Sequence, residues 1–233
     1  MISKKCVLKS IILFFLFLLV CCSPNQEAET SNILRKGNGS EPQTLDPHLA
    51  EGVPASNILR DLYEGLMLTG PSGDPITGAA EKVKMSVDGK IYTFYLKKNS
   101  KWSNGEPVVA NDFVNGFRRS LDPKTGSKYS LILACIKNAE AVIKGDLPPE
   151  KLGVKALDNY TLQVTLKAAT PYFLGLLTHS TSYPIHLKSV TTFGKEFTKP
   201  GNLVSNGAYT LKDWVVQSHI TIKKRPSTSF IRL

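Results

Sequence analysis

The sequence predicts an α/β fold with insertions, in which helices and strands are mixed without a strict βαβ rhythm. Two patterns support this prediction. Some segments repeat apolar residues at spacings of three and four, which is typical of a helix with one buried face. Others alternate apolar and polar residues, as a half-buried strand does. The two kinds of segment follow each other along the chain, so neither an all-α nor an all-β fold is expected.

The helical pattern is found in four places. We expect helices at 55–66, 111–121, 131–144 and 172–177. Gly65, Gly70 and Pro71 mark the end of the first helix and the loop behind it. Pro171 stands where the last helix opens, a position at which proline is favoured.

The strand pattern is clearest around Phe94. There Tyr92, Phe94 and Leu96 fall on one face, and the residues between them on the other. We expect strands at 33–35, 91–97, 160–166, 209–214 and 220–224.

Composition points to a globular protein rather than a nucleic-acid-binding one. The chain has 233 residues, of which 42% are hydrophobic and 21% charged, and its formal net charge is +10. The basic residues are scattered, and no long basic run or arginine-rich helix occurs. Solvated faces therefore explain the charge, and no nucleic-acid partner is expected.

The start of the chain predicts export. Three lysines precede an unbroken apolar run at 11–20, which is too short to span a bilayer comfortably and suits a signal peptide. The run ends in a sequence like a bacterial lipobox, with Cys21 as the small residue before an acylated Cys22. We therefore expect a lipoprotein signal peptide at 1–21, a flexible tether at 22–31, and a lipid anchor to a bacterial membrane at Cys22. An ordinary cleaved signal with incidental cysteines is the alternative.

Export leaves one cysteine in the folded part. Cys135 lies in an apolar stretch and is expected to be a buried structural thiol, with no disulfide partner. No cofactor is expected.

Four groups of motifs carry a resemblance to a known family. They are 39–48 with 51–54; 92–98 with 101–108 and 110–113; 152–158 with 160–166; and 199–202 with 206–214. These stretches resemble the family-5 solute-binding proteins of bacterial ABC importers, most closely the periplasmic oligopeptide-binding proteins. The second group is the most specific.

The resemblance implies a periplasmic-binding-protein-like class II α/β fold that is only partly present. It assigns 32–64 and 187–224 to an incomplete first lobe and 65–186 to a small continuous lobe. The second large lobe is absent, and 225–233 is expected to be an aberrant tail.

The resemblance also implies a ligand site. Glu51, Gly52 and Val53 match a segment that lines the peptide cleft in relatives, and Tyr129 matches a position that borders the ligand. Gly52 lets another backbone approach, and a neighbouring extended backbone can pair with a peptide as an added strand. The alternatives are a surface turn for Glu51–Val53 and ordinary half-buried packing for Tyr129. His48 and Glu51 are three residues apart but lack a third ligand, so no metal is expected.

Two nearby residues are expected to serve the scaffold. Trp102 precedes an Asn-Gly turn and is predicted to be a buried anchor. Val109 stands where relatives carry a helix-capping Thr. It cannot cap, although Asn111 or Asp112 can partly substitute.

These observations favour a binding protein without catalysis. Its expected partners are oligopeptides and the ABC permease subunits, and binding by this chain is expected to be weak or absent. Another ligand, such as murein peptide or haem, is an alternative, and so is a non-functional fragment. A secreted hydrolase is disfavoured because no Gly-x-Ser-x-Gly or His-Glu-x-x-His motif occurs.

Overall fold

The computed structural model describes residues 33–226 and divides the chain into two units, Met1–Gly37 and Asn38–Leu233. In the first unit, the described residues form neither helix nor strand, so the strand predicted at 33–35 is wrong. Ile33 and Leu34 are 62% and 89% exposed, and no neighbouring strand pairs with them within 33–226. The predicted signal peptide, tether and Cys22 lie outside the described residues.

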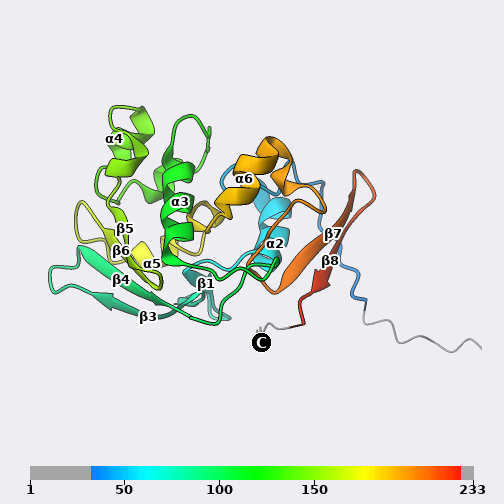
Figure 1. The fold of residues 1–233 in the computed structure, drawn as a ribbon, viewed down its shortest axis with the longest axis horizontal. Coiled ribbons are helices and arrows are strands. Elements are labelled where there is room, and N and C mark those ends of the chain that lie inside the picture. Colours follow the sequence, from blue (N-terminus) through cyan, green and yellow to red (C-terminus); the bar gives the residue numbers. More distant parts are fainter. Residues whose placement is uncertain (1–32, 227–233) are drawn as a thin grey trace, which may run out of the picture. The chain divides into compact units, whose positions relative to one another are not determined.

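A four-stranded antiparallel sheet is the largest sheet among the described residues and lies at one side of the second unit (Figure 1). Its strands are β3 (Ala80–Met85), β4 (Ile91–Leu96), β5 (Val154–Asp158) and β6 (Thr161–Thr165), in the order β3-β4-β6-β5. Phe94 lies opposite Leu162 in the register, and both are fully buried. Tyr92, Phe94 and Leu96 share the buried face, which confirms the alternation predicted for this strand.

Helix α3 (Ala110–Leu121) covers the buried face of this sheet (Figure 1). Phe113 and Phe117 on its inner side are completely buried in the same core cluster as Phe94. The helix predicted at 111–121 is therefore confirmed. Val109 at the N-cap makes no side-chain cap, but the Asp112 carboxylate accepts the Val109 backbone N–H at 2.9 Å, so Asp112 is the expected substitute.

The predicted helix at 131–144 is wrong in its middle. The chain forms a 3₁₀ turn η1 (Ser130–Leu133), then a short helix α4 (Ala139–Lys144), and Asn138 between them has a left-handed φ of 68°. The Lys137 N–H donates to the Thr165 carbonyl, and Ile136 forms a bridge with Leu166. Contacts with the C-terminal end of β6 thus replace the helical hydrogen bonds that the apolar spacing suggested.

The other short elements connect the sheet to its surroundings. Helix α2 runs over Gly52–Leu62, so it begins and ends earlier than predicted, and α5 (Phe173–Leu176) is shorter than the helix predicted at 172–177. The remaining elements are β1 (Met67–Thr69), β2 (Pro75–Thr77), η2 (Pro149–Lys151), η3 (Ser180–Ser182), α6 (Leu187–Phe193) and η4 (Gly194–Thr198). Within 33–226, no helix has the length and apolar character needed to cross a membrane.

A two-stranded hairpin, β7 (Tyr209–Val215) and β8 (His219–Lys224), ends the described chain. It confirms the two final strands. Gly207, just before it, donates its N–H to the Leu62 carbonyl at the end of α2, and a Cβ there would lie 2.5 Å from the Leu62 carbonyl carbon. The close contact explains why glycine stands at this point of the Asn206–Trp214 motif.

Arg225 belongs to the folded part, although the tail was predicted to begin there. It is 9% exposed, and its backbone N–H donates to the Ala208 carbonyl. Its guanidinium donates to the carbonyls of Gly207, Lys101 and Trp102 at 2.9–3.1 Å. The hairpin is therefore fastened to the Trp102 loop by a residue just beyond its last strand.

Candidate functional site

The segment predicted to contact ligand forms the start of α2. Glu51 is the N-cap in extended conformation, with φ −121° and ψ 146°, and Gly52 has a left-handed φ of 77°. Glu51, Gly52 and Val53 are exposed, and Val53 keeps 69% of its surface accessible. The Glu51 side chain makes no cap hydrogen bond, so its carboxylate remains available to an outside partner. Glycine is needed here for its backbone angle, because the nearest atom to a Cβ would be 3.7 Å away in Pro54.

Asn38 fixes the first turn of this helix from outside. Its side-chain amide donates to the Pro54 carbonyl at 3.0 Å, and its side-chain oxygen accepts from Asn57 at 3.2 Å. The Ser56 hydroxyl donates to the Gly52 carbonyl. The exposed Glu51–Val53 edge thus rests on a turn that is held by hydrogen bonds from Asn38.

A buried ion pair holds the chain immediately before Glu51. Asp46 is 3% exposed and receives two hydrogen bonds from the Arg119 guanidinium of α3, at 2.8 and 2.6 Å. Burial alone would raise the pKa of Asp46, but the hydrogen bonds and charge of Arg119 leave it below its usual range. The carboxylate also accepts the His48 N–H, so it closes the turn as well as pairing with α3.

His48 completes this anchor, and both of its ring nitrogens have partners there. Its Nδ1 accepts from Arg119 at 2.9 Å, which leaves Nε2 to donate to the Tyr183 carbonyl at 3.1 Å. Burial and the Arg119 charge lower the pKa of His48 from 6.5 to about 4. Within residues 33–226 no group of three His, Cys, Asp or Glu side chains could hold a metal ion.

The segment around η3 links this anchor to Tyr129. At one end of the segment, the Tyr183 carbonyl receives His48, and the Tyr183 ring stacks on Tyr63 at the end of α2. At the other end, the His179 ring packs edge-on against Tyr129 with centroids 5.1 Å apart. Tyr129 is 37% exposed, so its side chain is partly covered and partly open to solvent.

The two predicted contact regions are therefore connected through shared support. Segment η3 contacts α2, α3 and η1, the turn that Tyr129 opens. No hydrogen bond or ring contact joins Tyr129 directly to Glu51–Val53 in the described part of the chain. Both remain predictions as ligand contacts, and both have the exposure that a contact requires.

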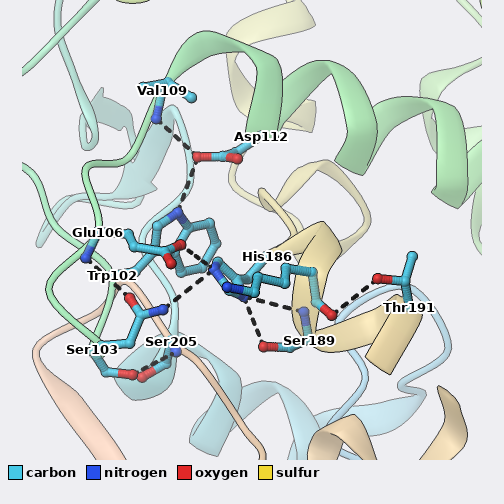
Figure 2. A network of polar contacts seen from close by, with 11 residues as sticks. Trp102, Ser103, Glu106, Val109, Asp112, His186, Ser189, Thr191 and Ser205 are labelled. Atoms are coloured by element: carbon cyan, nitrogen blue, oxygen red, sulfur yellow. Dashed lines mark hydrogen bonds and ion pairs between the residues drawn. The ribbon is translucent and has the colours of Figure 1, made fainter. Parts of the chain in front are cut away.

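A second polar network lies around His186, at the start of α6 (Figure 2). His186 Nε2 lies 2.7 Å from the Glu106 carboxylate, and Nδ1 lies 2.7 Å from the Ser189 hydroxyl. The order Ser–His–carboxylate matches that of hydrolytic triads. Ser189, however, is only 4% exposed, and its backbone N–H also donates to His186 Nδ1, so the arrangement caps α6.

The same network fixes the Trp102 loop. The Trp102 indole N–H donates to Asp112 of α3 at 3.0 Å, and its ring packs edge-on against His186 (Figure 2). The Ser103 backbone N–H donates to the Ser205 carbonyl, and the Ser205 backbone N–H donates to the Ser103 hydroxyl. Trp102 is 1% exposed, which confirms its predicted scaffold role. The loop thereby joins the starts of α3 and α6 and the segment leading into β7.

Sequence reasoning missed the residues that support the site. Asp46 and His48 lie within a recognised motif, but the partner on α3, Arg119, is seventy-three residues from Asp46. His179 was also missed, because its contact with Tyr129 depends on a 3₁₀ turn without a sequence signature. A pair of opposite charges in segments expected to pack together was the available signal for Asp46 and Arg119.

The mixed fold with its small antiparallel sheet is that of a part of an extracellular solute-binding protein. The chain belongs to the bacterial extracellular solute-binding proteins, family 5, whose middle-region model matches residues 74–228. Solved structures of the periplasmic-binding-protein-like class II fold support the same assignment.

Three relatives illustrate the similarity. The periplasmic oligopeptide-binding protein OppA of Escherichia coli (strain K12) is 47% identical over 202 residues, 86% of this chain and 37% of its own length. The periplasmic murein peptide-binding protein MppA of the same organism is 43% identical, over 78% of this chain and 34% of its own. The Haemophilus influenzae OppA structure in complex with RPPGFSPFR has a TM-score of 0.78 and 41% identity, over 82% of this chain and 37% of its own. The chain thus spans little more than a third of these relatives.

Proposed function

We propose that this chain forms one wall of the peptide-binding site of an extracytoplasmic receptor that delivers oligopeptides to an ABC permease. The observation that carries the proposal is the exposed start of α2, where the Glu51 carboxylate has no cap to make and the backbone is held by Asn38. A carboxylate beside unpaired helix N–H groups can receive a peptide amine or Lys side chain while its neighbours pair with peptide carbonyls.

Binding by this chain alone should be weak. A peptide on one wall keeps its other side in water and lacks the partners for its remaining polar groups. Each charge-assisted hydrogen bond that is missing lowers affinity by about ten- to a hundredfold, since it contributes about 1.5–3 kcal/mol. The role is binding rather than catalysis, as the names of the relatives also indicate.

We place the receptor outside the cytoplasm, anchored to a bacterial membrane through acylated Cys22. The support is the apolar run and lipobox-like sequence at 11–23 and the periplasmic relatives. Intact-mass measurement of membrane-extracted protein should show an acylated N-terminus at Cys22. An unmodified terminus at Ser23 or Met1 would contradict the anchor.

Peptide binding can be mapped by NMR titration with tri- to pentapeptides. We expect millimolar affinity and shift changes at Glu51–Val53 and Tyr129, reduced in Glu51→Gln and retained in the surface control Glu150→Gln. Absence of shifts at millimolar peptide would favour a non-functional fragment. Calorimetric binding in the micromolar range or tighter would instead show that one wall suffices.

Murein peptide is the second candidate ligand, because MppA is nearly as similar to this chain as OppA is. Both candidates are peptides, and they differ in the amino acids that compose them. Competition between a murein tripeptide and an all-L tripeptide at Glu51–Val53 would rank them. Haem, the other alternative, has no support from the described side chains.

A further inference from the structure

A depression of about 730 Å³ lies on the small sheet, and none of the predicted peptide contacts line it. Its lining comes from the start of β3, from the end of β4 and the residues just after it, and from the tight turn between β5 and β6. The lining residues are Glu81, Tyr95, Leu96, Lys98, Asp158, Asn159, Tyr160 and Thr161. Its size falls in the range of small-molecule sites, which is about 300–1,000 Å³.

Three of the lining residues, Tyr95, Asp158 and Thr161, lie on the face of the sheet opposite the core. Tyr95 lies across from Thr161 in the register, and Thr161 lies across from Asp158. Residues directly opposite each other in an antiparallel pair point to the same side. Since Phe94 and Leu162, one position away, face the core and are fully buried, this row of side chains faces away from α3.

Two β-bulges converge on this end of the sheet. On β3 the register shifts between Ala80 and Lys82, with Glu81 as the extra residue, and on β5 it shifts between Ala156 and Asp158. A bulge re-aims the side chains that follow it and is often found beside a site. On β5 its effect is to set Asp158, rather than exposed and apolar Leu157, opposite Thr161.

The charges around the depression are of both signs. Glu81 and Asp158 supply carboxylates, and Lys98 supplies an ammonium group, with Lys84 5.7 Å from the centre of the Tyr95 ring. Asp158 accepts the Tyr160 backbone N–H at 2.7 Å, which fixes the direction of its carboxylate. A strongly cationic or anionic ligand would meet a like charge here, so the lining suits a neutral ligand with many donors and acceptors.

The two tyrosine rings add an apolar component. Tyr95 and Tyr160 are each half-buried, so part of each side chain remains accessible. Carboxylates, an amide and an ammonium group together accept from and donate to hydroxyl groups, and a tyrosine ring packs on apolar C–H faces. We propose that this depression is a second binding site, separate from the peptide wall, for a neutral saccharide of one to a few sugar rings.

The test is an NMR titration of the purified chain with three probes. They are the trisaccharide of N-acetylglucosamine, maltotriose, and putrescine as a diamine. We expect at least one trisaccharide to shift the backbone signals of Tyr95, Lys98 and Asp158–Thr161, and putrescine to leave them unchanged. Shifts from putrescine alone would make the site a cation site and overturn the proposal, and so would the absence of any shift up to the solubility limit.

A matched pair of variants tests the carboxylates. In Glu81→Gln/Asp158→Asn, both groups keep their size, and the side-chain amide oxygen introduced by the second substitution can still accept the Tyr160 N–H. We expect saccharide affinity to fall by at least about tenfold, since hydrogen bonds to charged groups are the stronger ones. The control Asp146→Asn/Glu150→Gln makes the same chemical changes on exposed residues of the same lobe and should bind as the unmodified chain does.

Equal loss in both pairs, or no loss in the first, would contradict the assignment. If the first pair is poorly folded by circular dichroism, Glu81→Gln alone replaces it, because Glu81 is exposed and its substitution should leave the fold intact. In either case, the residues whose NMR signals shift in the unmodified chain show where the saccharide binds.

Discussion

In the four-stranded sheet, β4 and β6 are paired along both edges, whereas β7 and β8 pair only with each other among the described residues. The sheet buries Phe94, Leu162 and Val164 completely under α3. The hairpin leaves Ile220 and Ile222 only half-buried against the same core cluster. The four-stranded sheet is thus stabilised by more strand pairing and more apolar burial than the β7–β8 hairpin is.

Side chains outside the strands make up part of this difference. Arg225 fastens the end of the hairpin to three carbonyls, and Glu41 accepts from the Trp214 indole and the Gln217 backbone N–H at the opposite end. A hairpin with two open edges is marginal by itself. The comparison teaches that local stability here should depend on a few polar contacts in the hairpin and on apolar volume in the sheet.

The largest effect is expected from removing apolar volume in the sheet. Phe94→Ala should lower the free energy of unfolding by about 3–5 kcal/mol, because a fully buried ring leaves a cavity under α3. Urea denaturation followed by circular dichroism measures it. Thr93→Ala, on the open face of the same strand, is the control and should cost less than about 1 kcal/mol. A similar loss of unfolding free energy in both variants would show that the buried and open faces of β4 do not differ in their contribution to stability.

The next effect concerns the anchor that joins the segment before α2 to α3. His48 has a folded pKa of about 4 against 6.5 for the free side chain, so the unfolded chain binds its proton first as the pH falls. Stability should therefore be fully present above pH 6.5 and fall by about 3 kcal/mol between pH 6.5 and 4. The lowered pKa of Asp46 extends the loss to more acidic pH.

His48→Gln isolates this contribution. Glutamine can accept from Arg119 or donate to the Tyr183 carbonyl without titrating. We expect a lower stability at neutral pH but a flatter dependence between pH 6.5 and 4, measured by urea unfolding at each pH. His219→Gln, an exposed histidine on the hairpin, is the control. An unchanged slope in His48→Gln would show that His48 does not couple folding to acid.

For the hairpin, Arg225→Met should cost about 2 kcal/mol, because it leaves three backbone carbonyls without the guanidinium that serves them. Burial lowers the pKa of Arg225, but the group stays charged at neutral pH. Arg225→Lys keeps the charge but loses the planar guanidinium with its several donors. Its stability should therefore lie between that of Arg225→Met and that of the unmodified chain. Hydrogen exchange should quicken in β7 and β8 and not in β4. Equally faster hydrogen exchange in the hairpin and in β4 would contradict a role of Arg225 that is specific to the hairpin.

The sequence predicted best where burial alone determines the structure. β4 and α3 have one buried face each, so their spacing identified both the element and its inward residues. The apolar run at 131–144 fits a helix equally well, but there the Lys137 backbone bonds to Thr165 at the end of β6, a long-range contact that spacing cannot show. Arg225 was missed for a similar reason, since its partners are backbone carbonyls of distant residues.

The candidate site was only partly accessible to the same reasoning. Glu51–Val53 came from a family resemblance, and its exposure agrees with a contact role without testing it. Gly52 is predicted to let another backbone approach, which stays a prediction, and the structure adds a second reason for glycine, its positive φ at the helix start. The Asp46–Arg119 pair required knowing that the two segments pack together.

The smallest expected effect is at the tip of the hairpin. Glu41→Gln keeps one oxygen near Trp214 but loses the charge that strengthens both hydrogen bonds, so stability should fall by less than about 1 kcal/mol. Mobility is the more sensitive readout, because Trp102 is buried and Trp214 is half-exposed. Acrylamide quenching of tryptophan fluorescence therefore reports mainly on Trp214. It should increase in Glu41→Gln and stay constant in Glu150→Gln, an exposed acid outside the hairpin. Unchanged quenching in Glu41→Gln would mean that other contacts hold the indole without Glu41. The Lys199 ammonium, 5.8 Å from the Trp214 ring centre, would be one of them.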